Sequence, residues 1–179
     1  MGKPSGAMEV TTLVEQHYAM LYRFAYRLSG SAVDAEDLTQ ETFCTAQEKI
    51  GQLRDPASAR GWLCKILRNH FLHRRRANNV VTWESLDSLE CDPEDAADAA
   101  AEVDSERLQA VLADLPEAFR TPVILFYFEE FSYRQIADQL GVPIGTVMSR
   151  LARAKAFLRY RLRPHCDAAP LNPARPGVT

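Results

Sequence analysis

Cationic side chains dominate the stretch from 139 to 164, which contains no acidic residue. Ammonium groups neutralise phosphates, and a guanidinium can also donate two parallel hydrogen bonds to the edge of a guanine. The cations of this stretch are Arg150, Arg153, Lys155, Arg159, Arg161 and Arg163. This chemistry binds an anionic polymer without breaking a covalent bond, so the element that carries these side chains decides what they contact.

An apolar stripe with intervals of three and four predicts that the cations lie on one amphipathic helix. The stripe consists of Val147, Leu151, Ala154, Leu158 and Leu162. At 3.6 residues per turn, Ser149 points directly away from the stripe, with Ala152 and Arg153 beside it. The residues that flank this outward face are Thr146, Met148 and Arg150.

The preceding segment, "FSYRQIADQLGVP", predicts a short helix and a tight turn. Ser132 and Gln135 have the spacing of a capping box, Gly141 suits a left-handed helix end, and Pro143 prevents the helix from continuing. Small residues at Ala137 and Gly141 are expected to let two helices cross closely. The pattern favours a helix-turn-helix whose second helix enters a major groove, over an ordinary helical hairpin with a solvated basic face.

A second basic segment runs from 56 to 83 without an acidic residue. Its cations are Arg60, Lys65, Arg68, Arg74, Arg75 and Arg76. Phosphate contacts of this kind give affinity but little sequence information, whereas the Asn69 amide can both donate to and accept from a flipped base. Trp62 and Phe71 could stack on bases, but we favour both as core residues.

Acidic residues gather elsewhere in the chain. Asp34, Asp37 and Glu41 recur at helical spacing, which predicts either a charged docking face or a solvated face favoured by the helix dipole. Residues 77–106 contain ten carboxylates and no Lys or Arg. Low hydrophobicity and high charge there predict an acidic flexible linker.

Composition agrees with a globular protein, because 46% of the 179 residues are hydrophobic. The net charge of −3 conceals the segregation of basic and acidic segments. No apolar run is long enough to cross a membrane and no signal peptide is evident, so we expect a cytoplasmic protein without membrane insertion. No nucleophile–base pair, phosphate-cradling glycine loop or metal motif occurs, so we expect no enzyme activity, cofactor or small-molecule substrate.

Four cysteines are widely spaced, which predicts reduced thiols. Cys44 and Cys64 fall within helical patterns and are expected in the core. A zinc site built from Cys64, His70, His73 and Cys91 matches no familiar ligand spacing. A thiol- or zinc-based redox sensor that uses Cys64, His73 and Cys91 is the rival of a different class.

The elements that position these residues are predicted to be helices throughout. We expect helices over 12–29 and 32–49, the second of which buries Val33, Leu38, Phe43 and Ala46 after a capping box at Ser31. A third helix follows Pro56, and Pro122 should kink or restart a later one. The predicted fold is all-α, with two small helical domains over 10–78 and 104–163 and the linker over 79–103. Residues 1–9 are predicted to be a disordered extension or an artificial remnant, and 164–179 a disordered tail.

Three motifs in this order resemble a bacterial RNA polymerase sigma factor of the extracytoplasmic-function group, which is group four of the sigma-70 family. "DAEDLTQETF" (34–43) is similar to the polymerase-binding segment of that family. "ARGWLCKILRNHFLHRRR" (59–76) is similar to its promoter-melting and minus-ten segment. "LPEAFRTPVILFYFEEFSYRQIADQLGVPIGTVMSRLARAK" (115–155) is similar to its minus-thirty-five domain. The resemblance implies sigma domain two, then sigma domain four.

The resemblance also implies roles for individual positions. Polymerase-binding residues would be Asp34, Asp37, Gln40 and Glu41. Minus-ten DNA-binding residues would be Arg60, Lys65, Arg68, Asn69, His73, Arg74, Arg75 and Arg76. Minus-thirty-five DNA-binding residues would be Thr146, Met148, Ser149, Arg150, Ala152, Arg153 and Lys155. His73 and Met148 depart from the usual residues of the family, which are acidic and cationic respectively.

The partners that the resemblance implies are core RNA polymerase, through its β′ coiled coil and β flap, promoter DNA, and an anti-sigma factor. The function implied is promoter-specific initiation, with melting by domain two and upstream-element reading by domain four. A dimeric helix-turn-helix regulator that acts without polymerase is the alternative, but it gives the acidic helix and Asn69 no role.

Overall fold

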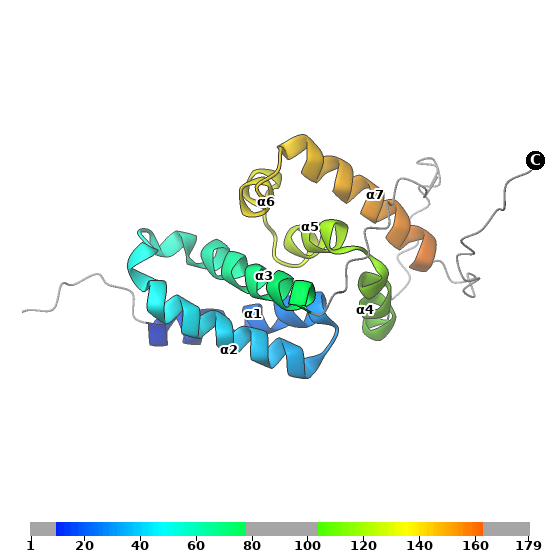
Figure 1. The fold of residues 1–179 in the computed structure, drawn as a ribbon. Coiled ribbons are helices and arrows are strands. Elements are labelled where there is room, and N and C mark those ends of the chain that lie inside the picture. The colour runs from blue at the N-terminus through cyan, green and yellow to red at the C-terminus, as the bar shows by residue number, and fades with distance from the viewer. Residues whose placement is uncertain (1–9, 78–103, 163–179) are drawn as a thin grey trace, which may run out of the picture.

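The computed structural model describes residues 10–77 and 104–162, and helices account for most of both ranges (Figure 1). The elements in chain order are α1 (Val10–Ser29), α2 (Ala32–Lys49), the short 3-10 helices η1 (Ile50–Gln52) and η2 (Pro56–Ser58), α3 (Ala59–Ala77), α4 (Ser105–Asp114), α5 (Glu117–Tyr127), α6 (Tyr133–Leu140) and α7 (Ile144–Leu162). Neither described range contains a strand, and the predicted all-α class is confirmed. The predicted extension, linker and tail lie outside the described residues.

Helices α1 to α3 form the first unit by packing their apolar faces together. Leu21, Phe24, Leu38, Leu63 and Leu67 are among its fully buried side chains. The prediction that Val33 is buried was wrong, since its side chain is 70% exposed. Val33 precedes the fully buried Thr42 by nine residues, which places it about 180° from the buried side of α2 at 3.6 residues per turn.

Local capping fixes where these helices begin. The Ser31 hydroxyl accepts the Asp34 N–H at 3.3 Å, which is one half of the capping box that we predicted. The Asp55 carboxylate accepts the Ala57 N–H at 3.0 Å, immediately before α3. An N-cap of this type is worth about 1 kcal/mol, so the polar residues between the helices set their boundaries.

Helices α4 to α7 form the second unit, and α6 and α7 are the predicted helix-turn-helix. Ser132 accepts the Gln135 N–H at 3.3 Å, and Gln135 accepts the Ser132 N–H at 2.8 Å, which confirms this capping box. Gly141 ends α6 with φ of 66°, the left-handed conformation that glycine adopts without cost. A β carbon at Gly141 would meet no atom within 4 Å, so backbone conformation rather than close crossing requires glycine there.

Helix α5 runs through Pro122 as a single element, so the expectation that this proline restarts the helix was wrong. Every residue from Arg120 to Leu125 is buried. Proline removes one backbone donor from the helix. The burial of this entire run offsets the loss of a single hydrogen bond, which sequence pattern alone does not reveal.

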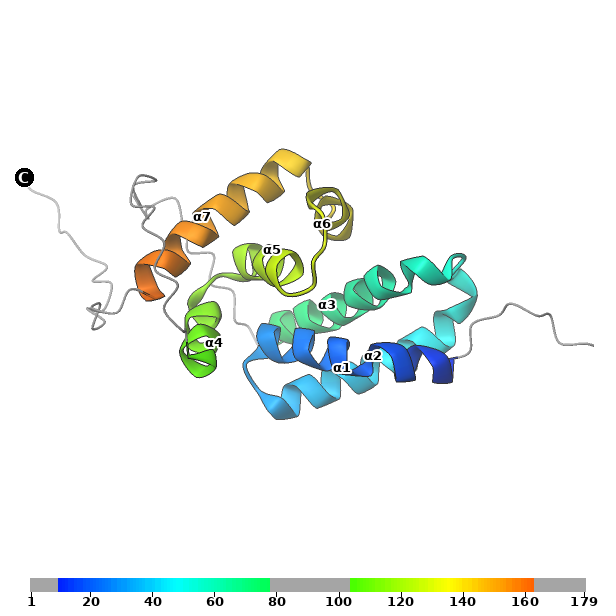
Figure 2. The same cartoon turned by 180° about the vertical axis from the view of Figure 1, so that it is seen from behind.

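The two units pack against each other. Helix α1 contacts α4 and α5, and α3 contacts α6; Figures 1 and 2 show α4 and α5 beside the α1–α3 unit from opposite sides. One core cluster joins buried residues of both units, from Leu13 to Phe157. A search of the described helices for a membrane-spanning segment finds none.

Candidate nucleic-acid and polymerase interfaces

Helix α7 presents a continuous outward face. Its buried side is formed by Val147, Leu151, Ala154 and Phe157, close to the predicted stripe. The side chains on the opposite side are exposed at Met148, Ser149, Ala152, Arg153 and Lys155, and half-buried at Thr146 and Arg150. Helix α6 contacts α7 and lies beside the end at which α7 begins (Figure 1). The outward side that the sequence pattern predicted for this helix is therefore accessible to solvent.

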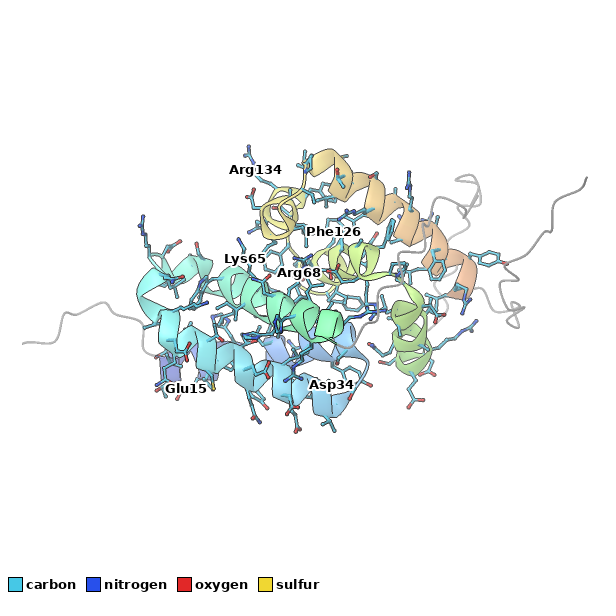
Figure 3. The ribbon with its side chains drawn as sticks, viewed as in Figure 1. Glu15, Asp34, Lys65, Arg68, Phe126 and Arg134 are labelled. Atoms are coloured by element: carbon cyan, nitrogen blue, oxygen red, sulfur yellow. The ribbon has the colours of Figure 1, made fainter. Side chains whose placement is uncertain are left out.

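Helix α3 carries a row of three exposed polar residues at intervals of four, Lys65, Asn69 and His73. An interval of four keeps side chains on one side of a helix. Figure 3 shows the side chain of Lys65 standing out from α3 on the side of α6. Three of the eight predicted minus-ten residues thus share one exposed row, which we call the α3 row.

Two further predicted minus-ten residues are engaged by the second unit. The Arg60 Nη2 lies 3.1 Å from the Glu129 Oε2, and the Arg68 Nε donates to the Glu117 Oε1 at 3.1 Å. Figure 3 shows Arg68 directed from α3 towards α5. Only 19% of the Arg68 side chain and 40% of the Arg60 side chain are exposed. Sequence reasoning placed both cations on a nucleic-acid face and missed their carboxylate partners.

Arg74 is engaged within the first unit, by the predicted polymerase-binding face. Its Nη2 donates to the Glu41 Oε1 at 2.5 Å, and its Nη1 lies 3.8 Å from the Asp37 Oδ2. The hydrogen bond with Glu41 raises the pKa of Arg74. His70 approaches the same carboxylate at 3.6 Å through Nδ1, and its Nε2 lies 2.9 Å from the Thr45 hydroxyl oxygen. Arg74 and His70 of α3 therefore contact carboxylates of the acidic face of α2.

The predicted site residues of the first unit that remain are Asp34, Gln40, Arg75 and Arg76. Asp34 and Gln40 are exposed on α2, and Figure 3 shows Asp34 on the side turned away from α6 and α7. The Arg75 guanidinium lies 5.8 Å from the centre of the Phe71 ring. Arg76 falls within α3, and Phe71 is buried as predicted, while Trp62 is half-buried against the core.

Two buried charged residues at the contact between the units were not predicted. Arg120, 7% exposed, donates to the backbone carbonyls of Leu28 (2.7 Å) and Leu115 (2.8 Å), and also of Ala113. Burial lowers the pKa of Arg120 to about 10. Burial raises the pKa of Glu129, against the opposing effect of its hydrogen bond from Arg60. Arg120 follows Phe119 and precedes the apolar run 122–128, which is a sequence signal that could have identified it, whereas the adjacent Glu129 and Glu130 cannot be told apart from the sequence.

Of the two cysteines predicted in the core, the structure buries Cys64 but not Cys44. Cys64 is buried, its Sγ lies 3.9 Å from the Met20 Sδ, and burial raises the pKa of its thiol to about 12. Cys44 is exposed, so its assignment to the core was wrong. It lies in a hollow beside Glu41 and Arg74, on the polar flank of α2 rather than on its apolar face. Cys91 lies outside the described residues, and no metal-binding cluster of His, Cys, Asp and Glu occurs within them.

Two protein-family models match the chain in the order of its two helical units. The model described as Sigma-70 region 2 matches residues 13–80, and the model described as Sigma-70, region 4 matches residues 105–158. Together the two matches cover more than half of the 179 residues.

Curated relatives extend this similarity to nearly the whole chain. The chain is 42% identical over 164 residues to the ECF RNA polymerase sigma factor SigE of Mycolicibacterium smegmatis, covering 86% of this chain and 61% of that protein. The chain therefore spans less than two thirds of that relative. It is 35% identical over 175 residues to the ECF RNA polymerase sigma factor SigL of Mycobacterium tuberculosis, covering 91% of this chain and 97% of the relative.

Solved structures share the arrangement of helices. The sigma factor RpoE in complex with the anti-sigma factor NepR, from Bartonella quintana, superposes with a TM-score of 0.69 at 27% identity, covering 87% of this chain and 98% of RpoE. CnrH, solved in complex with the cytosolic domain of CnrY, superposes with a TM-score of 0.62 at 24% identity over 84% of this chain and 85% of CnrH. The second likeness bears on the fold alone.

Proposed function

Because the chain belongs to the sigma-70 family of RNA polymerase sigma factors, in its extracytoplasmic-function group, we propose that it binds core RNA polymerase and directs initiation at a specific set of promoters. The observation that carries this proposal is the order of the two family matches, region 2 followed by region 4, each on a unit with a cationic helix. We accordingly name the two units domain two and domain four. The protein acts by binding and performs no covalent chemistry.

Domain two is proposed to engage polymerase and the melted minus-ten element. The acidic face of α2, formed by Asp34, Asp37, Gln40 and Glu41, would dock on the basic β′ coiled coil, since complementary charge orients and accelerates docking. Asn69 in the α3 row would hold a flipped base through its amide. The adjacent cations would neutralise phosphates, with Lys65 in the α3 row already exposed.

Domain four is proposed to read the upstream element through α7 while it contacts the β flap. Arg153 would read a base edge, and Met148 and Ala152 can offer only apolar contacts such as one to a thymine methyl. Thr146, Arg150 and Lys155 would hold phosphates on either side. Ser149 lies at the centre of the exposed face, where its hydroxyl can accept or donate a hydrogen bond.

An anti-sigma partner is proposed by analogy with RpoE, whose solved structure contains the anti-sigma factor NepR. Initiation by core polymerase would take place in the cytoplasm, so we propose that the protein is located there. The dimeric regulator gains no support, since region 2 matches across the whole of domain two.

Reconstitution tests the proposal directly. The purified chain is mixed with core polymerase and a bacterial genomic fragment library, and bound fragments and new transcripts are sequenced. We expect transcripts from a narrow set of promoters that share two spaced elements, absent with core alone. A chain that bound duplex DNA specifically without polymerase, and neither associated with core nor started transcripts, would instead support the dimeric regulator.

A further inference from the structure

The first turn and a half of α7 carries two exposed apolar side chains, Ile144 and Met148. Ile144 is 49% exposed and Met148 is 52% exposed, and neither belongs to the buried side of the helix. We propose that this apolar pair reads the methyl groups of thymines in the major groove, so that the leading end of α7 selects A·T pairs. The inference rests on the proposed function of α7 and deepens it, because it names the base pair and adds Ile144, which the sequence pattern did not assign to DNA.

The two side chains of the apolar pair lie close together near the start of the helix. An interval of four residues makes side chains neighbours on a helix surface. Ile144 is the first residue of α7, and the N-terminal residues of a recognition helix are those that contact base edges. A rise of about 1.5 Å per residue separates the pair by about 6 Å along the axis, which is roughly two base-pair steps of about 3.4 Å. The pair can therefore contact thymines of two neighbouring base pairs.

The charge around the apolar pair fits DNA as its occupant. No acidic residue occurs between 139 and 164, and on the same helix Arg150 is half-buried and Lys155 is exposed. Apolar side chains among cations complement an apolar group that is set in an anionic polymer. The thymine methyl is the apolar group that the major groove presents, and phosphates line that groove on both sides. Methionine is unbranched and adaptable, so Met148 can follow the position of such a methyl group.

Gly145 leaves the helix backbone uncovered beside the apolar pair. A β carbon at Gly145 would meet no atom within 4 Å, and its φ is not positive. Neither crowding nor backbone conformation in the described part of domain four therefore requires glycine there, although glycine is less favourable in a helix than alanine. Contacts between carbon atoms are effective only at about 4 Å. The missing side chain lets α7 approach the floor of the groove closely enough for contacts of this kind.

Ser149 follows Met148 and supplies a hydrogen-bond acceptor. Its hydroxyl donates to the Thr146 carbonyl at 3.0 Å, so the exposed oxygen is left to accept a hydrogen bond from outside the helix. Adenine N6 and cytosine N4 are the donors that base pairs present in the major groove. Of these two kinds of base pair, only A·T also carries a methyl group. Ser149 and Met148 are thus suited to the two bases of an A·T pair.

The first test deletes the methyl groups without changing base pairing. The promoter fragment recovered most often in the genomic selection is made as a synthetic duplex in which deoxyuridine replaces every thymidine of the upstream element. Holoenzyme, formed from the full chain and core polymerase, should bind this upstream-substituted duplex about tenfold more weakly than the unmodified duplex, or about three- to fivefold for each of two methyl groups. A duplex with deoxyuridine only in the spacer is the control and should bind within about twofold of the unmodified duplex.

Two results of this binding experiment would overturn the proposal. One is equal affinity for the unmodified and the upstream-substituted duplex. The other is a selected upstream element that contains no A·T pair, because the apolar pair would then have no methyl group to contact.

The second test assigns the loss to the apolar pair. The double variant Ile144→Ala with Met148→Ala should bind the unmodified duplex about tenfold more weakly than the parent, and deoxyuridine should change its affinity by less than about twofold. Tyr160→Ala removes a side chain of the same helix that is 50% exposed, and this control should keep the full response to deoxyuridine. A double variant that kept the full response would refute the proposal, because the methyl groups would then act on other residues or through the shape of the DNA.

Initiation separates this result from the proposed function. Run-off transcription from the unmodified duplex, with and without the chain, shows whether the chain acts as a sigma factor. A chain that starts transcripts but binds the unmodified and upstream-substituted duplexes equally refutes only the reading of methyl groups. A chain that never starts transcripts refutes the proposed function, and this inference with it.

Discussion

Helices α3 and α7 are both 19 residues long and rich in arginine, yet they differ in what lies against their charged sides. On α3, Arg60, Arg68 and Arg74 each meet a carboxylate of the same chain. On α7, the face from Met148 to Lys155 remains exposed along one side. The comparison shows that the neighbouring elements, and not the cationic composition of a helix, decide which of its cations meet a carboxylate of the same chain.

The contact between the domains is the origin of this difference, and Arg120 is one of its buried charged residues. Arg120→Ala leaves the carbonyls of Leu28 and Leu115 without their donor, and each unpaired buried acceptor costs about 1–3 kcal/mol. We expect the free energy of unfolding to fall by about 3 kcal/mol or more, measured by urea denaturation. Arg159→Ala removes an exposed cation from α7 and should change it by about 0.5 kcal/mol at most. A similar value for both variants would contradict the structural role of Arg120.

Asn69 tests the part of α3 that stays exposed. Asn69→Ala should slow promoter opening roughly 5- to 150-fold, because loss of base hydrogen bonds removes about 1–3 kcal/mol. Association with core polymerase, followed by gel filtration, should not change. An exposed amide on the neighbouring helix is removed by Gln47→Ala, which should leave opening intact. Failure of premelted templates to rescue Asn69→Ala would show that Asn69 has another role.

Helix positions and caps followed from the sequence because their causes are local. The Ser132–Gln135 capping box and the left-handed Gly141 depend on residues within one turn, and both occur as predicted. The buried face of α7 likewise follows from a period of 3.6 residues. The prediction for Val33 was wrong for a local reason as well, since its direction relative to the other residues predicted to be buried in the same helix could have been calculated from this period.

The pairing of cations could not be predicted from the sequence, because the partners lie far along the chain. Glu117 and Arg68 are separated by 49 residues, and Glu129 and Arg60 by 69. No periodicity links such positions, and the two domains have independent hydrophobic patterns. Resemblance to a family supplied roles for the arginines but not the arrangement in which domain four covers them.

Arg153 tests the exposed face of α7. Arg153→Ala should weaken initiation about tenfold at promoters with the upstream element, because one base contact by arginine contributes about 1–3 kcal/mol of discrimination. On templates that lack this element, the variant and the parent should give equal amounts of run-off transcript. An equal loss on both templates would assign Arg153 to the phosphate backbone rather than to a base.

Lys155 gives the smallest expected effect and separates affinity from reading on the same helix. Lys155 is exposed, and the phosphate contact proposed for it would neutralise one charge without reading a base. Lys155→Ala should weaken holoenzyme binding about threefold on every promoter and reduce the slope of log affinity against log salt by about 1. The fragments selected by the variant should contain the same upstream motif, since backbone contacts position α7 without specifying sequence. A changed motif would mean that Lys155 reads a base, and the base-reading part of the exposed face of α7 would then extend from Arg153 to Lys155.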